Sequence, residues 1–183
     1  MDTGMEEDEQ SQRFDLRKDL WIYFLALVIG LGVGVMGSAF HYCVNVAFDL
    51  YSGIPVLFSG NRTLIILIAA LLGSVMVGAS VLLVRRFAPE AAGSGIQEIE
   101  GAMGGLRPVR WRYVFPVKFI GGVLSMGAGL VLGREGPTIH LGGCIGKIVG
   151  ERTKASTEIM NTLLAAGATA GLSVAFSAPL GAI

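Results

Sequence analysis

Long apolar runs separated by short polar stretches dominate the first half of this chain. Residues 20–46 carry no charged side chain, and residues 64–84 form a second apolar run that ends before two arginines. Each run is long enough to cross about 30 Å of hydrocarbon as a tilted helix. Trp21 and Tyr23 begin the first run, where aromatic side chains favour the membrane–water boundary. The pattern therefore predicts two membrane-spanning helices.

The second half of the chain is also apolar, but its runs are short and interrupted. The pattern predicts a brief helix within residues 93–103 and an apolar run over residues 113–132, in which Lys118 is the one charged residue. The stretch Gly133–Pro137 breaks this run, and two more short apolar segments follow it. We therefore expect broken helices rather than simple spans after residue 86.

The polar residues 1–19 precede the first apolar run. Their acidic start lacks the basic region of a cleavable signal peptide, so we expect a disordered tip that runs into a short surface helix. Residues 20–183 are expected to form a transmembrane domain. Arg13, Arg17 and Lys18 lie just before the first span, and more arginines follow the second span than the first. The positive-inside rule then predicts a cytoplasmic N-terminus.

Composition agrees with a membrane protein. The chain is 52% hydrophobic and 15% charged, whereas soluble domains average about 25% charged residues. It holds 27 glycines, about twice the usual share. Glycines four residues apart let helix backbones approach closely in lipid. Such spacing occurs in Gly30/Gly34, Gly129/Gly133, Gly142/Gly146/Gly150 and Gly167/Gly171. The sequence thus predicts an all-α polytopic membrane protein with close helix packing.

Two glycine-bounded motifs interrupt the apolar pattern, GSGIQ at Gly93–Gln97 and GREGP at Gly133–Pro137. In each motif glycine permits a sharp turn, and the residues that follow can begin a helix. Pro137 suits a first helical turn, because the amide hydrogen that it lacks would be unpaired there. Free N–H groups at a helix start carry partial positive charge. Two such starts at membrane depth predict an anion pocket.

One polar side chain in each motif is a candidate for this chemistry. The hydroxyl of Ser94 can donate to an anion, or it can act as an ordinary helix cap. Glu135 lies between apolar segments, where a carboxylate is costly unless it is neutralised or paired. Helix-start amides could satisfy it, and a carboxylate resting on them would occupy an anion's place. Protonation would free that place, so Glu135 could act as gate and as proton carrier.

The motifs form part of a longer series that resembles a known family. In chain order the series is GSGIQEIEG, PVKFIGG, GREGPTIHLGG and AAGATAGLSVAFSAPLGAI. It is similar to the CLC family of chloride channels and chloride/proton antiporters, and it resembles the bacterial antiporters most. The resemblance runs from about residue 20 to residue 183. It implies the first half of a CLC-type inverted repeat with tilted and broken helices, as a partial transmembrane domain truncated at its C-terminal end.

The resemblance also implies roles for individual residues. Ser94, in the turn with Gly93, would coordinate the central chloride through its hydroxyl. The backbone amides of Arg134, Glu135 and Gly136 would form an outer anion site, with Glu135 as the gating, proton-accepting glutamate. A serine rather than a proline at this place in the GSGIQ motif implies chloride rather than nitrate as the preferred anion.

Partners and location follow from the same resemblance. The chain would act in a bacterial inner membrane, surrounded by lipid, on chloride exchanged for protons, and the full-length family member would be a homodimer. Gln97 replaces the family's commoner proline, beyond the coordinating groups. The family's inner proton-path glutamate would come shortly after Ile183. A passive voltage- or pH-gated chloride channel therefore stays an alternative, as does a nonfunctional fragment that needs a separate C-terminal half.

Lys118 is expected to need a charge partner, because a lone ammonium is costly in an apolar span. Glu98 and Glu100 lie on the short helix of the GSGIQ motif, and we predict a structural pair between Lys118 and Glu100. His41 and His140 are expected to be polar groups facing neighbouring helices rather than ligands.

Enzyme, nucleotide-binding and nucleic-acid functions are disfavoured. The glycine cluster at residues 30–34 lies inside an apolar run without a strand–turn–helix unit, and GREGPT lacks the lysine of a P-loop. The formal net charge is zero, which leaves no basic footprint for nucleic acid. Cys43 and Cys144 lie far apart and outside any metal-ligand spacing. We therefore expect no enzyme activity, cofactor or metal.

Overall fold

The structure, a computed structural model, describes residues 3–57 and 61–178. Within these ranges the chain is helical, with no strand. The helices are α1 (Thr3–Leu57), α2 (Arg62–Phe87), the short 3-10 helix η1 (Pro89–Ala91), α3 (Ile96–Met103), α4 (Trp111–Gly127), α5 (Glu135–Arg152) and α6 (Thr157–Phe176). The predicted all-α fold with short, broken helices in the second half is confirmed.

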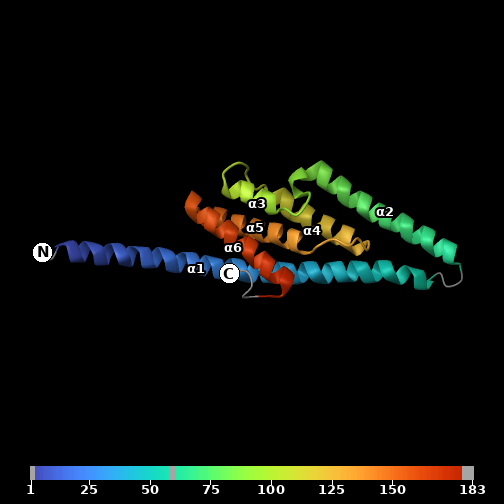
Figure 1. Ribbon diagram of the computed structural model, residues 1–183, viewed down its shortest axis with the longest axis horizontal. Coiled ribbons are helices and arrows are strands. Elements are labelled where there is room, and N and C mark those ends of the chain that lie inside the picture. Colours follow the sequence, from blue (N-terminus) through green and yellow to red (C-terminus); the bar gives the residue numbers. More distant parts are fainter. Residues whose placement is uncertain (1–2, 58–60, 179–183) are drawn as a thin grey trace.

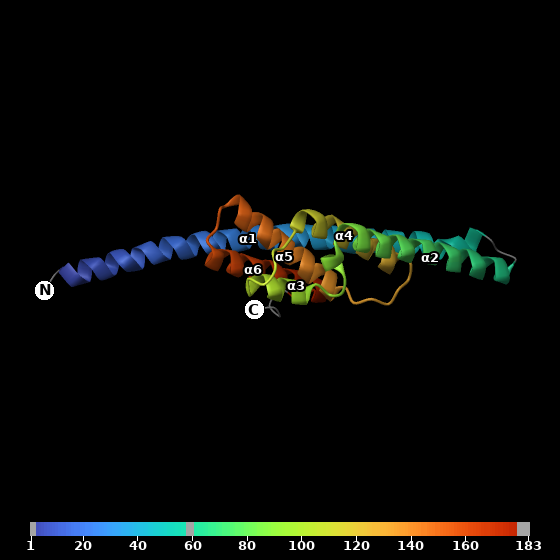
Figure 2. The same cartoon turned by 90° about the horizontal axis from the view of Figure 1, so that it is seen from above.

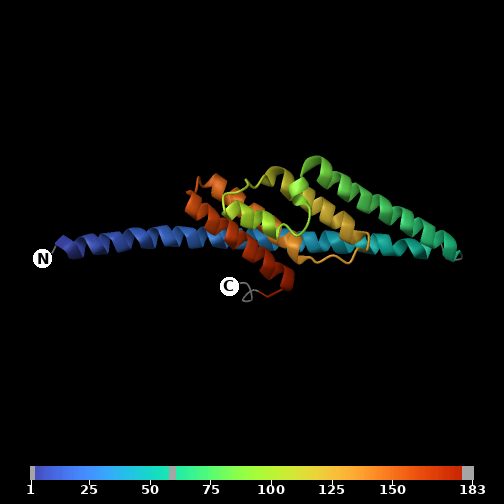
Figure 3. The ribbon, with the colours of Figure 1, turned by 45° about the horizontal axis from the view of Figure 1, so that its top comes forward.

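Helix α1 is a long rod that runs along the length of the molecule and is crossed by α6 (Figure 1). Its N-terminal part extends past the other helices in all three ribbon views (Figure 1, Figure 2 and Figure 3). The predicted boundary at residue 19 is not marked by a helix end, because no glycine or proline lies between residues 5 and 29 to stop the helix. Helix α1 therefore runs through residue 19 without a break, and the expected short surface helix and cytoplasmic placement of residues 1–19 stay predictions.

Helix α2 returns alongside the C-terminal half of α1 (Figure 1). The side chain of Asn61 starts it by accepting hydrogen bonds from the amides of Thr63 and Leu64 at 3.1 and 3.3 Å. Ser80 is its one buried residue, and its hydroxyl donates to the carbonyl of Gly121 on α4 at 2.9 Å. Most of the apolar surface of α2 therefore faces outward, as expected of a helix in lipid.

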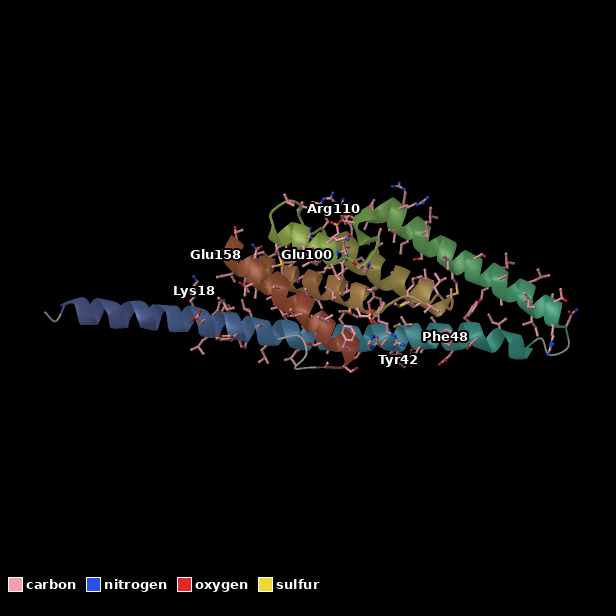
Figure 4. The ribbon with its side chains drawn as sticks, viewed as in Figure 1. Lys18, Tyr42, Phe48, Glu100, Arg110 and Glu158 are labelled. Carbon is pink, nitrogen blue, oxygen red and sulfur yellow. The ribbon has the colours of Figure 1, made fainter. Side chains whose placement is uncertain are left out.

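One face of α1 forms the base of the core. Its buried residues recur at spacings of three or four, which is the period of a helix face. They are Leu25, Ile29, Val33, Met36, Phe40 and Val44. They pack against α4, α5 and α6, while Tyr42 and Phe48 on other faces of α1 are exposed (Figure 4). Among the described residues, three helical stretches are long and apolar enough to cross a membrane, namely Lys18–Ile54, Arg62–Phe87 and Thr157–Phe176.

Glycine makes the contact between α5 and α6. A Cβ built at Gly142 would overlap the carbonyl oxygen of Gly167, and one built at Gly146 would overlap the carbonyl oxygen of Leu163. These two helices therefore touch through their backbones, as the four-residue spacing predicts. Gly30 and Gly34 share the spacing but have open space beside them. Gly129 and Gly133 lie in the stretch between α4 and α5, so their spacing has no role in helix packing.

Candidate anion site at two helix starts

The backbone turns sharply before α3. Gly93 and Gly95 both have left-handed backbone angles, with φ of 67° and 83°, which glycine adopts without steric cost. Ser94 lies between them and is exposed. Its Oγ accepts a long hydrogen bond from the amide of Ile96 at 3.4 Å. The hydroxyl hydrogen of Ser94 stays available to a ligand in this arrangement, because the oxygen is the acceptor in that bond.

A second helix begins at the GREGP motif. Helix α4 ends at Gly127, and α5 begins at Glu135, with Gly136 and Pro137 as its second and third residues. The hydroxyl of Thr138 donates to the carbonyls of Arg134 and Glu135, both at 2.9 Å, and stiffens this first turn. The amides at such a start lack partners within their own helix. The predicted break and helix start at GREGP are thus present.

The two helix starts meet. A Cβ built at Gly136 would lie 2.8 Å from Cα of Ser94 and 2.9 Å from its carbonyl oxygen. Only glycine allows this approach, since any side chain at position 136 would push the Ser94 turn away. The contact brings together residues more than 40 positions apart in the chain.

A cavity of about 540 Å³ lies at this junction. Gly93, Ser94, Glu135 and Gly136 all line it, together with Ser125 of α4. A Cβ built at Gly133 would overlap the carboxylate of Glu135, so this carboxylate lies against the turn that precedes its own helix. Of the sequence-predicted site residues, Arg134 is exposed and does not line this cavity, although it precedes Glu135 directly.

The predicted pair of Lys118 and Glu100 is not formed. Lys118 is buried, with 6% of its surface exposed. Its ammonium donates to the carbonyl of Ala91 at 3.0 Å and to the carbonyl of Gly93. Glu100 is exposed on α3 (Figure 4). Backbone carbonyls left unpaired by the glycine turn satisfy the lysine instead of a carboxylate.

His140 is a neighbour of the site that sequence reasoning did not place there. It lies one turn beyond Pro137 on α5, is almost fully buried, and packs directly on Gly95. No partner for its Nδ1 is found among the described residues, and the same holds for Nε2 of His41. The sequence places His140 five residues after Glu135 on the same predicted helix, which indicates that it lies near the site. That spacing does not predict the contact of His140 with Gly95.

An ion pair outside the candidate spans holds the other end of the Ser94 turn. The guanidinium of Arg110 donates to both carboxylate oxygens of Glu90, at 2.6 and 2.8 Å. These hydrogen bonds hold the pKa of Glu90 below its ordinary value. Glu90 belongs to η1, directly before the turn, so this pair links the turn to the loop that precedes α4.

Comparisons with known proteins identify the family of this chain. A model of the voltage gated chloride channel family matches residues 73–183. The H(+)/Cl(-) exchange transporters ClcA of Salmonella typhimurium and Salmonella paratyphi A are each 48% identical over 165 residues, which is 90% of this chain and 35% of those proteins.

A solved structure is also similar. The X-ray crystal structure of a slow cyanobacterial Cl-/H+ antiporter matches with a TM-score of 0.84 and 43% identity, over 88% of this chain and 38% of that one. The chain therefore spans about a third of the length of the relatives that it matches. The family match covers more than half of the chain, and the predicted resemblance is confirmed. This chain belongs to the voltage gated chloride channel family.

Proposed function

We propose that this chain forms the N-terminal part of a proton-coupled chloride antiporter. The proposal places the anion at the junction of α3 and α5. On the α3 side it is bound by the hydroxyl of Ser94, whose turn includes Gly93. On the α5 side it is bound by the backbone amides of Arg134, Glu135 and Gly136. The observation that carries the proposal is the contact of Gly136 with Ser94, which puts two helix starts on one cavity. Partial positive charge from both starts favours a negative ligand there.

Glu135 is the gate and the proton acceptor in this proposal. Its carboxylate shares the cavity with the anion site and is attracted by the same amides. A charged carboxylate and a chloride therefore compete for one place. When Glu135 takes a proton, its carboxyl loses this attraction, leaves, and admits chloride. Each proton carried by Glu135 is in this way linked to anion movement.

No lysine or arginine is among the described residues that line the cavity. Lys118 is buried, and its ammonium donates to loop carbonyls. Partial charges hold an anion weakly enough for release, whereas a bare ammonium would retain it. Serine rather than proline at position 94 favours chloride over nitrate. The proposed location is a bacterial inner membrane, with the N-terminus in the cytoplasm and residues 1–19 on that side.

Two relatives named as exchange transporters and one solved Cl-/H+ antiporter support antiport. Because the chain spans about a third of their length, the proposal concerns a transporter that contains this chain, expected to be a homodimer. A passive chloride channel and a fragment that needs a separate C-terminal half are the alternatives.

The test follows chloride and proton movement together in lipid vesicles that hold the transporter containing this chain. Glu135→Gln keeps the shape of the side chain but removes its proton exchange. We expect chloride flux to persist while proton movement driven by a chloride gradient is lost. Ser94→Ala removes a hydrogen bond to a charged ligand and should weaken chloride binding about tenfold or more. Glu100→Gln, which changes an exposed carboxylate of α3, is the matched control.

The outcomes separate the alternatives. Proton movement that persists in Glu135→Gln contradicts the gate assignment. Chloride flux without proton movement in the unsubstituted protein identifies a channel. If vesicles holding this chain alone conduct no chloride, but conduct once a C-terminal half is supplied separately, the chain is a fragment of the working protein.

A further inference from the structure

Lys118 makes an unusual set of contacts for a charged residue. It is more than nine-tenths buried in α4, and no carboxylate among the described residues lies within ion-pair distance of it. Two of its three N–H groups are used on the carbonyls of Ala91 and Gly93. Burial of an ammonium is costly. A buried Lys118 therefore needs a compensating role, which is either to hold these two carbonyls in place or to supply positive charge.

The carbonyl of Gly93 belongs to the same peptide unit as the amide of Ser94. No described peptide bond is cis, and in a planar trans peptide the C=O and N–H bonds point in opposite directions. Holding the Gly93 carbonyl on α4 therefore turns the Ser94 amide away from α4. No protein acceptor for that amide is found in the described residues. A donor fixed in direction and left without a protein partner is what an anion requires.

The turn itself cannot fix this direction. Left-handed glycines lie on both sides of Ser94, and glycine has the widest choice of backbone angles. Gly136 and His140 contact Ser94 and Gly95 from the α5 side. On the α4 side the ammonium of Lys118 is the group that holds the turn by hydrogen bonds, within the part of the chain that the structure describes.

We propose that Lys118 is a positioning residue. By binding the carbonyls of Ala91 and Gly93, it aims the amide of Ser94 at the anion. This inference rests on the proposed anion site and adds to it the group that sets the direction of one donor. The rival explanation is that the charge of Lys118 acts on chloride at a distance, whatever the turn does.

The test compares Lys118→Met, which has no donor, with Lys118→Gln, which keeps N–H donors on a neutral side chain one bond shorter. Chloride affinity is measured by calorimetric titration of the transporter that contains this chain, and hydrogen exchange is measured on the peptide covering residues 91–97. If the aimed conformation falls to about a tenth of the population, the apparent affinity falls about tenfold. Lys147→Met, which removes a half-buried cation paired with Glu151, is the control.

We expect exchange and affinity to change together. In Lys118→Met the amide hydrogens of residues 91–97 should exchange faster, and chloride should bind about tenfold more weakly. Lys118→Gln should give intermediate exchange rates and affinity, and Lys147→Met should change neither. Weaker binding with unchanged exchange of the turn would show that the charge acts at a distance. Unchanged affinity in Lys118→Met would also overturn the inference.

If Lys118→Met does not fold, Lys118→Gln is compared with the unsubstituted protein instead. Its chloride affinity and its hydrogen exchange then distinguish positioning of the turn from a charge that acts at a distance. If the unsubstituted protein binds no chloride, the proposed function itself fails, and it fails independently of Lys118.

Discussion

The backbone contact between α5 and α6 leads to a sharp prediction about stability. Gly142→Ala adds one methyl group where α6 leaves no room. The new Cβ would overlap the carbonyl oxygen of Gly167, lie 3.0 Å from its carbonyl carbon, and lie 3.3 Å from Cα of Gly171. All three atoms are backbone, so no side chain can rotate away and the two helices must separate.

The size of the effect follows from this geometry. Overpacking a well-packed core costs typically about 1–3 kcal/mol. We expect the upper part of that range for Gly142→Ala, because a rigid helix has to shift. A matched control is Gly34→Ala on α1, where a Cβ would meet nothing within 4 Å. Alanine is better than glycine in a helix by about 0.5–1 kcal/mol, so the control should be neutral or slightly stabilising.

The assay is thermal unfolding of the detergent-solubilised protein, followed by circular dichroism and by the fraction that stays monodisperse. Gly142→Ala should unfold at a clearly lower temperature than Gly34→Ala. Gly167→Ala overlaps the carbonyl oxygen of Gly142 in return, so the double variant should cost less than the sum of the two single ones. Equal unfolding temperatures for Gly142→Ala and Gly34→Ala would refute close backbone packing of these helices.

Three further predictions concern the ends of helices. Asn61→Ala removes the cap of α2 and should lower stability by about 0.5–2 kcal/mol in denaturant unfolding, whereas an unchanged midpoint would mean that the cap is not formed. Gly95→Ala places a side chain at φ 83° against the ring of His140 and should destabilise by at least about 1–3 kcal/mol, an expectation that unaltered unfolding would contradict. Hydrogen bonds from Arg110 lower the pKa of Glu90. The stabilisation from this pair is therefore complete above the ordinary pKa of 4.5 and is lost as pH falls through the lower pKa of the folded protein. Arg110→Met should remove this pH dependence from thermal unfolding measured between pH 3 and 7.

Local signals explain what the sequence could predict. The end of the second apolar run and the breaks at GSGIQ and GREGP depend on glycine, proline and charge within a few residues. Helices α2 and α3 begin and end close to the predicted places, and α5 begins at the predicted break. The polar composition of residues 1–19 predicts a short surface helix, whereas α1 runs continuously through residue 19. Helix propensity and the absence of breakers decide that question instead.

Long-range contacts explain what the sequence could not predict. Four-residue glycine spacing identifies helices able to pack closely, but it does not say which face of a helix has a neighbour. A Cβ built at Gly34 accordingly lies in open space. The two motifs predict helix starts that share an anion pocket, but the direct contact of Ser94 with Gly136 could not be predicted, because it joins residues more than 40 positions apart. Lys118 was assigned a carboxylate because sequence reasoning weighs side chains, whereas the carbonyls that bind it become available only once the glycine turn has formed.

The apolar length of α1 has a consequence for the way the molecule lies in a membrane. Its uncharged run over residues 20–46 measures about 40 Å along the axis, while the hydrocarbon core of a bilayer is about 30 Å thick. A helix that keeps this whole run inside the hydrocarbon inclines by about 40°, at the upper end of helix tilts. The two ends of the run are then offset by about 25–30 Å in the membrane plane. Because α1 also contacts α5, a thinner or thicker bilayer that changes this inclination would act directly on a helix that carries part of the proposed anion site.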